Sequence, residues 1–224
     1  MTEPFDYDTA FSRNIGWVTT DEQRKLRSSR VVIAGMGGVG GVHLLTLARL
    51  GVGSFRIADF DTFDLVNFNR QAGAMMSTLA KPKAAVLASM ARDINPDINI
   101  EVYDQGVTLD NLASFLAGAD VYVDGLEYFA FDIRLSMFEA CARLGIPAVT
   151  AAPLGMGTAL MNFLPGQMGF DDYFGWTGQS EDDRALRFMI GLAPRLLQDY
   201  LADPSRVNLS ARQFRDPELI ATVM

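Results

Sequence analysis

The chain has 224 residues, of which 49% are hydrophobic and 21% are charged, and its formal net charge is −8. This composition is typical of a folded globular protein and excludes the low hydrophobicity of a disordered chain. The negative charge argues against binding to DNA or other nucleic acid, because backbone binding depends on clustered lysine and arginine.

Cys141 is the only cysteine and His43 the only histidine. One chain therefore has neither a disulfide framework nor a cysteine and histidine zinc site, and we expect a cytoplasmic protein. The acidic N-terminus does not resemble a signal peptide. Residues 144–170 carry no charge, but three prolines and five glycines exclude a membrane helix, so two buried strands and a loop are expected there.

Strands and helices are predicted in alternation along the chain after an N-terminal helical arm, residues 1–29. The expected strands are 30–35, 54–60, 98–105, 120–125 and 146–152, and the expected helices are 39–51, 81–95, 108–117 and 128–144. This alternation predicts a doubly wound, Rossmann-like α/β fold, with a mostly parallel sheet and helices on both faces. A last strand over 158–165 is expected to be antiparallel.

This pattern divides the chain into the N-terminal arm and two further segments. Residues 30–165 are predicted to form the nucleotide-binding, Rossmann-like domain, and residues 166–224 a C-terminal loop and helical extension of the same domain. Within that extension, 169–183 is predicted to be an acidic loop dotted with aromatic residues. The stretch 184–200 has helical periodicity that breaks at Pro194.

The glycine cluster GMGGVG, residues 35–40, lies directly between a predicted strand and a predicted helix. Its spacing lets the chain turn sharply and brings backbone N–H groups and a helix N-terminus close to a phosphate. The alternative is a tight turn with a purely structural role. The predicted nucleotide contacts are Gly35, Gly37, Gly38 and Gly40.

Asp59 ends the second predicted strand, where an acid in this architecture accepts hydrogen bonds from ribose hydroxyls. The alternative is a loop carboxylate that caps the next turn. Asp61 and Asp64 are interpreted as solvated turn acids and receive no role. Up to this point NAD fits as well as ATP.

Asn67, Arg70, Gln71 and Lys83 follow Asp59 and supply a guanidinium, an ammonium and amide donors near the same edge of the sheet. A guanidinium fork and a lysine suit the crowded charge of a triphosphate. Either cation could instead be an ordinary surface residue.

Four segments together resemble the ThiF/MoeB/HesA-type adenylyltransferase superfamily, to which the ubiquitin-activating enzymes belong. They are GMGGVG, ADFDTFDLVNFNRQ, KPKAAVLASMARDINPDINIE and VYVDGLEYFAFDIRLSMFEACARLGIPAV, and the likeness covers about residues 10–165. The resemblance implies an enzyme that binds ATP with Mg²⁺, joins AMP to a carboxylate and releases pyrophosphate. The implied substrate is often the C-terminal glycine of a ubiquitin-like sulfur-carrier protein.

By this resemblance Asp59 holds the ribose, and Asn67, Arg70, Gln71 and Lys83 hold the phosphates. Arg13 falls where the family has an arginine that reaches into the partner subunit's site, which implies a homodimer.

The chain departs from the family where a D-x-x-D-N motif is usual. It has Asp124 as the acid at the end of the sheet, a nucleotide-binding candidate, and then Glu127 and Tyr128 in place of aspartate and asparagine. Glu127 still offers oxygen ligands to magnesium and joins Arg13, Arg70 and Lys83 as a candidate catalytic residue. The paired zinc cysteines of many relatives are absent from the sequence.

Cys141 has apolar neighbours and is interpreted as an inert core thiol, and His43 is interpreted as a structural residue.

Three alternatives to a carrier-protein adenylyltransferase stay open. The first is activation of a small-molecule or RNA-borne carboxylate, although the acidic charge disfavours RNA. The second is an NAD-dependent oxidoreductase, and the third is a non-catalytic partner that retains the fold.

Overall fold

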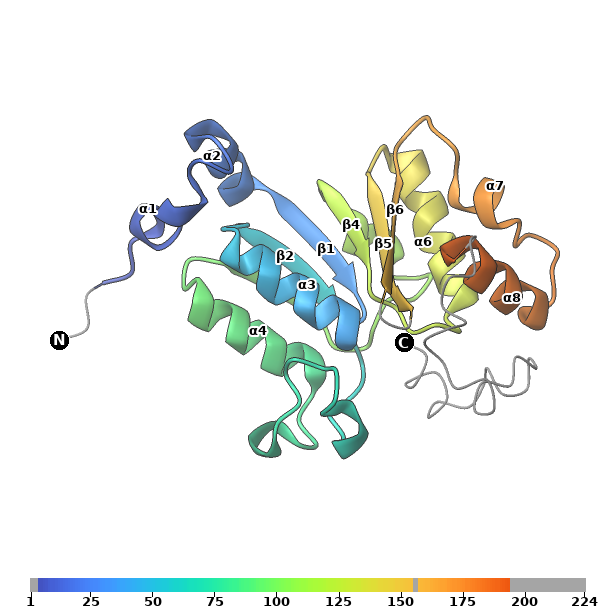
Figure 1. Ribbon diagram of the computed structural model, residues 1–224, viewed down its shortest axis with the longest axis horizontal. Coiled ribbons are helices and arrows are strands. Elements are labelled where there is room, and N and C mark those ends of the chain that lie inside the picture. The colour runs from blue at the N-terminus through green and yellow to red at the C-terminus, as the bar shows by residue number, and fades with distance from the viewer. Residues whose placement is uncertain (1–3, 155–156, 194–224) are drawn as a thin grey trace. The chain divides into compact units, whose positions relative to one another are not determined.

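The computed structural model describes residues 4–154 and 157–193 (Figure 1). The described residues form two compact units, one ending at Leu126 and the other beginning at Glu127. The predicted boundaries after residues 29 and 165 stay a prediction.

The first unit contains four strands and five α-helices in its described part. Its elements are α1 (Tyr7–Ala10), α2 (Thr20–Ser28), β1 (Arg30–Ala34), α3 (Gly38–Arg49), β2 (Ser54–Ala58), α4 (Lys83–Ile94), β3 (Asn99–Tyr103), α5 (Leu112–Leu116) and β4 (Val121–Asp124), with short 3-10 helices at Ser12–Asn14, Leu65–Asn67 and Met76–Thr78. The four strands are parallel in the order β3-β2-β1-β4. This confirms the predicted α/β class with a mostly parallel sheet.

Helices cover both faces of this sheet, and the alternation of side chains along β2 shows how. Phe55 and Ile57 point into an apolar core that includes Leu44 of α3 and Leu87 of α4. Arg56 points to the opposite face and donates through Nη1 to the carbonyl of Phe115 at the end of α5, at 3.2 Å. In Figure 1, α3 and α4 lie side by side across one face of β1 and β2.

The N-terminal helices are tied to the loop that follows α3. The hydroxyl of Tyr7 donates to the carbonyl of Gly51 at 2.6 Å, and the amide of Gln23 donates to the carbonyl of Leu50 at 3.0 Å. Gly51 adopts a φ of +87°, which agrees with its predicted place at the end of α3. The arm is therefore packed onto the first unit.

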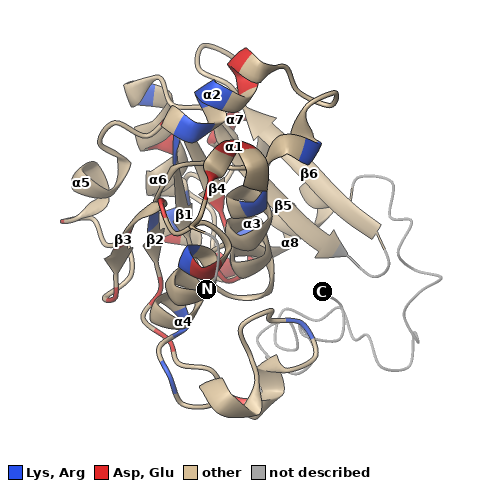
Figure 2. Ribbon diagram, turned by 90° about the vertical axis from the view of Figure 1, so that its left-hand side faces the viewer, with Lys and Arg blue, Asp and Glu red and all other residues tan. Residues whose placement is uncertain are grey.

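Charges of both signs lie along α4, as Figure 2 shows for the Lys/Arg and Asp/Glu positions of the ribbon. Lys83 begins the helix, and Arg92 and Asp93 lie next to each other in its last turns. The helix therefore carries no stripe of a single charge.

The second unit contains α6 (Phe131–Leu144), β5 (Ala148–Leu154), β6 (Gly157–Phe163), α7 (Phe170–Phe174) and α8 (Glu181–Leu192) in its described part. β5 and β6 pair antiparallel, from Ala148 opposite Phe163 to Leu154 opposite Gly157, as predicted. The expectation of two buried strands is wrong for β6, because its residues alternate between exposed and half-buried positions and Leu160 is 64% exposed.

The predicted loop over 169–183 is wrong in part, because it supplies the core of the second unit. It contains the helix α7, and Trp176 is fully buried, with its ring 4.9 Å from that of Phe170 and 5.2 Å from that of Phe188. The helix has five residues and ends at Gly175, which has a φ of +63°. A single turn is too short to show helical periodicity, so the sequence pattern indicated a loop.

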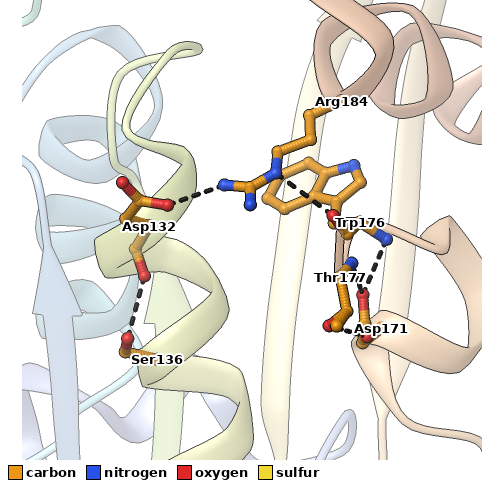
Figure 3. Close-up of polar contacts among 6 residues, drawn as sticks. All are labelled: Asp132, Ser136, Asp171, Trp176, Thr177 and Arg184. Atoms are coloured by element: carbon orange, nitrogen blue, oxygen red, sulfur yellow. Dashed lines mark hydrogen bonds and ion pairs between the residues drawn. The ribbon is translucent and has the colours of Figure 1, made fainter. Parts of the chain in front are cut away.

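Polar contacts fasten the segment around Trp176 to α6 and α8 (Figure 3). Arg184 lies 2.6 Å from the carboxylate of Asp132 and donates through Nε to the carbonyl of Trp176 at 3.2 Å. Asp171 accepts from the backbone N–H groups of Trp176 and Thr177 at 2.7 and 3.0 Å, and from the Thr177 hydroxyl.

No helix among the described residues is both long and apolar enough to cross a membrane. The helix α8 agrees with the helical periodicity predicted from residue 184, and the predicted break at Pro194 lies outside the described residues.

Candidate functional site

The glycine turn is closed tightly between β1 and α3. Gly35 has a φ of +88° and donates its N–H to the carbonyl of Ala58 at 2.8 Å. A Cβ at Gly35 would lie 2.0 Å from the carbonyl oxygen of Gly125, and a Cβ at Gly40 would lie 1.8 Å from that of Gly35. Neither position has room for a side chain, so α3 begins against the ends of β1 and β4.

Two residues from the loop after β2 lie against this turn. The Cγ of Arg70 is 3.4 Å from the place that a Cβ on Gly38 would take, and Nε2 of Gln71 is 3.8 Å from that place on Gly37. Gln71 is only 7% exposed, and its Oε1 has no hydrogen-bond partner within the described ranges. Buried amide oxygens are nearly always paired, so this acceptor suits a donor such as a water molecule or a ligand hydroxyl.

Arg70 is exposed, and its Nη1 donates to the carbonyl of Val66 and to Oδ1 of Asn69, each at 3.0 Å. A guanidinium has five N–H donors in a fork that matches phosphate oxygens. The two contacts hold the group by one nitrogen, which leaves its other donors for an anion.

Asn67 has a local role in the structure. It is 7% exposed, and its Oδ1 accepts from the N–H of Asp64 at 2.9 Å, within the 3-10 helix Leu65–Asn67. The carbonyl of Asn67 also accepts from the N–H groups of Arg70 and Gln71, at 3.2 and 2.9 Å. Asn67 therefore shapes the turn that presents these two residues.

Asp59 connects the end of β2 to the glycine turn. Its Oδ2 accepts from the N–H of Met36 at 2.6 Å, and its Oδ1 accepts from the N–H of Asp61 at 2.8 Å. Burial raises the pKa of Asp59 above its usual range, and the two backbone hydrogen bonds and the charge of Lys83 oppose this effect. A carboxylate has about four lone-pair sites, so these bonds leave room for hydroxyl donors.

Lys83 is connected to the same turn through Asp59 and Asp61. Its Nζ lies 3.0 Å from Oδ2 of Asp61, and its backbone N–H donates to the carbonyl of Asp61 at 2.9 Å. The sequence pattern predicted a solvated turn acid at Asp61; its side chain is 54% exposed, and the structure adds an ion pair to Lys83. The D-x-D spacing of Asp59 and Asp61 did not reveal this contact, because residues two apart in an extended segment do not by themselves indicate a shared partner.

Asp124 ends β4 at the same edge of the sheet. It pairs in register with Ala34 of β1, is 3% exposed, and accepts from the N–H of Leu126 at 3.2 Å. Glu127 belongs to the second unit; its side chain is exposed, and its carbonyl accepts from Arg134 at 2.8 Å. The structure therefore brings Asp124 into the first unit's set.

Arg13 lies in the 3-10 helix Ser12–Asn14, and its side chain is exposed.

Within the described ranges, no group of three or more His, Cys, Asp and Glu side chains is placed to hold a metal ion. Magnesium in nucleotide sites is usually held by one or two carboxylates and the phosphates themselves, so a single carboxylate such as that of Glu127 suits that chemistry.

Of the two other singled-out side chains, Cys141 is buried and His43 is half-buried. Burial raises the pKa of Cys141, in α6, to about 12, which suits the predicted inert core thiol. Burial lowers the pKa of His43, in α3, and its Nε2 has no hydrogen-bond partner within the described ranges.

A parallel sheet with a closed glycine turn after one strand and an acid after the next defines a Rossmann-like α/β protein. Residues 11–192 match the ThiF family, so the chain belongs to this family. The predicted superfamily is thereby confirmed.

Relatives of known name agree with this family. The chain is 35% identical over 148 residues to the sulfur carrier protein ThiS adenylyltransferase of Escherichia coli (strain K12), which covers 66% of this chain and 58% of that protein. It is 31% identical over 142 residues to the tRNA threonylcarbamoyladenosine dehydratase of Bacillus subtilis (strain 168), which covers 63% of this chain and 55% of that protein.

The chain is also similar to the structure of E. coli tRNA N6-threonylcarbamoyladenosine dehydratase, TcdA, in complex with ATP. The TM-score is 0.63 at 28% identity, and the match covers 67% of this chain and 62% of that chain. The chain spans less than two thirds of the length of each of these three proteins.

Proposed function

We propose that the chain is an ATP-dependent adenylyltransferase that activates a carboxylate. The observation that carries the proposal is the approach of Arg70 and Gln71 to the glycine turn, together with the Asp59 and Asp61 contacts that connect Lys83 to it. Two cations and a buried amide thus gather at a helix N-terminus, an arrangement that suits a polyphosphate. Membership of the ThiF family supports the same reaction.

In the proposed reaction a carboxylate oxygen attacks the α-phosphorus of ATP. The new O–P bond forms as the bond from the α-phosphorus to the oxygen bridging to the β-phosphate breaks, and pyrophosphate leaves with that electron pair. Lys83 and Arg70 stabilise the charge that gathers on the phosphoryl oxygens, and Asp59 accepts from the ribose hydroxyls. Asn67 and Gln71 donate to the phosphates through the N–H groups of their side-chain amides.

We propose that Glu127 offers an oxygen ligand to Mg²⁺, which would neutralise phosphate charge when bound. Arg13 is proposed to enter the site of a second copy, so the active species is a homodimer. A cytoplasmic location is proposed from the single cysteine.

The favoured carboxylate is the C-terminus of a ubiquitin-like sulfur-carrier protein, supported by the 35% identity to the ThiS adenylyltransferase. A small-molecule or RNA-borne carboxylate is the second candidate, and similarity to the tRNA threonylcarbamoyladenosine dehydratases favours it. The net charge of −8 weighs against RNA.

A thermal-shift experiment tests the nucleotide. ATP with magnesium should stabilise the protein by about 2.7 kcal/mol at a hundredfold excess over Kd. Stabilisation by NADH and not by ATP would favour an oxidoreductase, and no response to either would favour a non-catalytic partner.

ATP/pyrophosphate exchange tests the residues. Lys83→Ala or Arg70→Ala should each lower turnover by on the order of 10² to 10³, the usual loss for one charge-stabilising donor. Arg49→Ala is a matched control, because Arg49 is exposed at the other end of α3, about 16 Å along the helix from its first residue. Unchanged exchange in both test variants would remove Lys83 and Arg70 from the site.

Mixing variants tests the shared site. If Arg13 acts in the neighbouring subunit, Arg13→Ala chains mixed with Lys83→Ala chains should recover part of the activity that each lacks alone. A mixture no more active than its components would contradict a site built from two copies.

A further inference from the structure

The ion pair between Lys83 and Asp61 joins a buried cation to a half-exposed anion. Lys83 Nζ lies 3.0 Å from Asp61 Oδ2, and the side chains are 8% and 54% exposed. Lysine is rarely buried unless it is paired, so the carboxylate accounts for the position of this ammonium. The pair lies in the first unit and is linked to the glycine turn through Asp59, which accepts from the N–H groups of Asp61 and Met36.

Asp61 is itself held at three points. Its N–H donates to Oδ1 of Asp59, its carbonyl accepts from the N–H of Lys83, and its carboxylate contacts the Lys83 ammonium. Thr62 and Pro82 also form an isolated antiparallel bridge beside it. The loop after β2 and the start of α4 are therefore joined by backbone as well as side-chain contacts, which makes Asp61 a rigid support.

A lysine ammonium lies at the end of a flexible four-carbon stem, so an unsupported ammonium would sample many positions before it met a phosphate. Holding it in place beforehand removes that reordering from the reaction. The same carboxylate repels an incoming polyanion, so Asp61 opposes the binding of ATP in the ground state. The positioning of the Lys83 ammonium, and not affinity for ATP, therefore explains why a carboxylate lies in a phosphate site.

We infer that Asp61 is a positioning residue that holds the Lys83 ammonium beside the glycine turn, ready for the α-phosphate of the transferred adenylyl group. This inference rests on the proposed adenylyltransferase function. It differs from the proposed roles of Asp59 and Lys83, because Asp61 affects turnover only through Lys83.

A double-mutant cycle tests the inference in the full chain, with Asp61→Asn, Lys83→Ala and the combined variant. Isothermal titration measures the Kd for ATP, and ATP/pyrophosphate exchange at saturating ATP measures turnover. Asp61→Asn should lower saturated turnover by about 10- to 100-fold, the size of loss that a misplacement of about 1 Å causes. Its Kd for ATP should stay the same or fall, because a negative charge is removed.

In the Lys83→Ala background, Asp61→Asn should change turnover by less than about twofold, since groups that act through one another are not additive. Asp93→Asn is the control, because it removes the same charge from an exposed position on α4. Its turnover and Kd should match those of the parent chain.

Asp61→Glu keeps the carboxylate and should retain more turnover than Asp61→Asn; it also replaces that variant in the cycle if Asp61→Asn does not fold. Equal losses of turnover in Asp61→Glu and Asp61→Asn would overturn the inference. An Asp61→Asn loss of turnover that is the same in the parent chain and in the Lys83→Ala background would also overturn it. Both outcomes leave ATP binding by the parent chain intact. A parent chain that does not bind ATP at all would instead remove the proposed function, and the inference with it.

Discussion

Replacing Gly40 with alanine tests the closed glycine turn, with Gly38→Ala as the matched control in the same first turn of α3. A Cβ at Gly40 would lie 1.8 Å from the carbonyl oxygen of Gly35 and 3.0 Å from its carbonyl carbon. A Cβ at Gly38 would meet only Arg70 atoms, at 3.4 Å or more. The two variants therefore make the same chemical change with and without a backbone clash.

The size of the effect follows from these distances. A carbon cannot stay 1.8 Å from an oxygen, so either the start of α3 or the end of β1 must move by more than 1 Å, although Gly40 itself is buried. Overpacking of this kind costs about 1 to 3 kcal/mol, and alanine returns up to about 1 kcal/mol of helix propensity. We expect Gly40→Ala to lower the free energy of unfolding by about 2 kcal/mol, and Gly38→Ala to change it by less than about 1 kcal/mol.

Urea unfolding followed by circular dichroism measures this difference. With a denaturant slope of about 2 kcal/mol per molar, the Gly40→Ala midpoint should fall by about 1 M. A Gly40→Ala chain as stable as Gly38→Ala would refute the reasoning, because it would show that the turn has room for a methyl group.

Three further predictions use other parts of the chain. Since burial raises the pKa of Asp59 above 3.8, the folded chain holds that proton more tightly than the unfolded chain, and stability falls as the pH rises from about 3.8 through the raised pKa. The free energy of unfolding of Asp59→Asn minus that of the parent chain should therefore be larger at pH 7 than at pH 3, because only the parent chain loses stability over this range. A difference that does not change with pH would contradict this. Cys141, whose pKa is raised to about 12, should react with a thiol reagent at pH 8 at least about 100-fold more slowly in the folded chain than in urea; equal rates would place the thiol outside the core. Arg184→Ala removes the contacts to Asp132 and to the carbonyl of Trp176 and should lower the unfolding free energy by about 1 kcal/mol, whereas Arg187→Ala, at an exposed position on the same helix, should change it little. Equal losses in the two arginine variants would mean that these contacts are not stabilising.

Short-range patterns were enough to predict much of the fold. The apolar run at 30–34 and the glycine turn after it predicted a buried strand and a helix start, because each depends on residues within a few positions of one another. The position of Asp59 at the end of the second strand was readable for the same reason. Mispredicted elements were those with too few residues for a period, such as the single turn of α7.

Long-range contacts decided the rest. Asp61 and Lys83 are 22 positions apart, and nothing in either local sequence indicates that their side chains meet. The approach of Arg70 and Gln71 to the glycine turn likewise depends on how the loop after β2 folds back. Periodicity indicates which face of an element is apolar, but packing decides which residues meet across space. For this reason the ion pair of Lys83 with Asp61 and the buried amide of Gln71 became visible only in the tertiary structure.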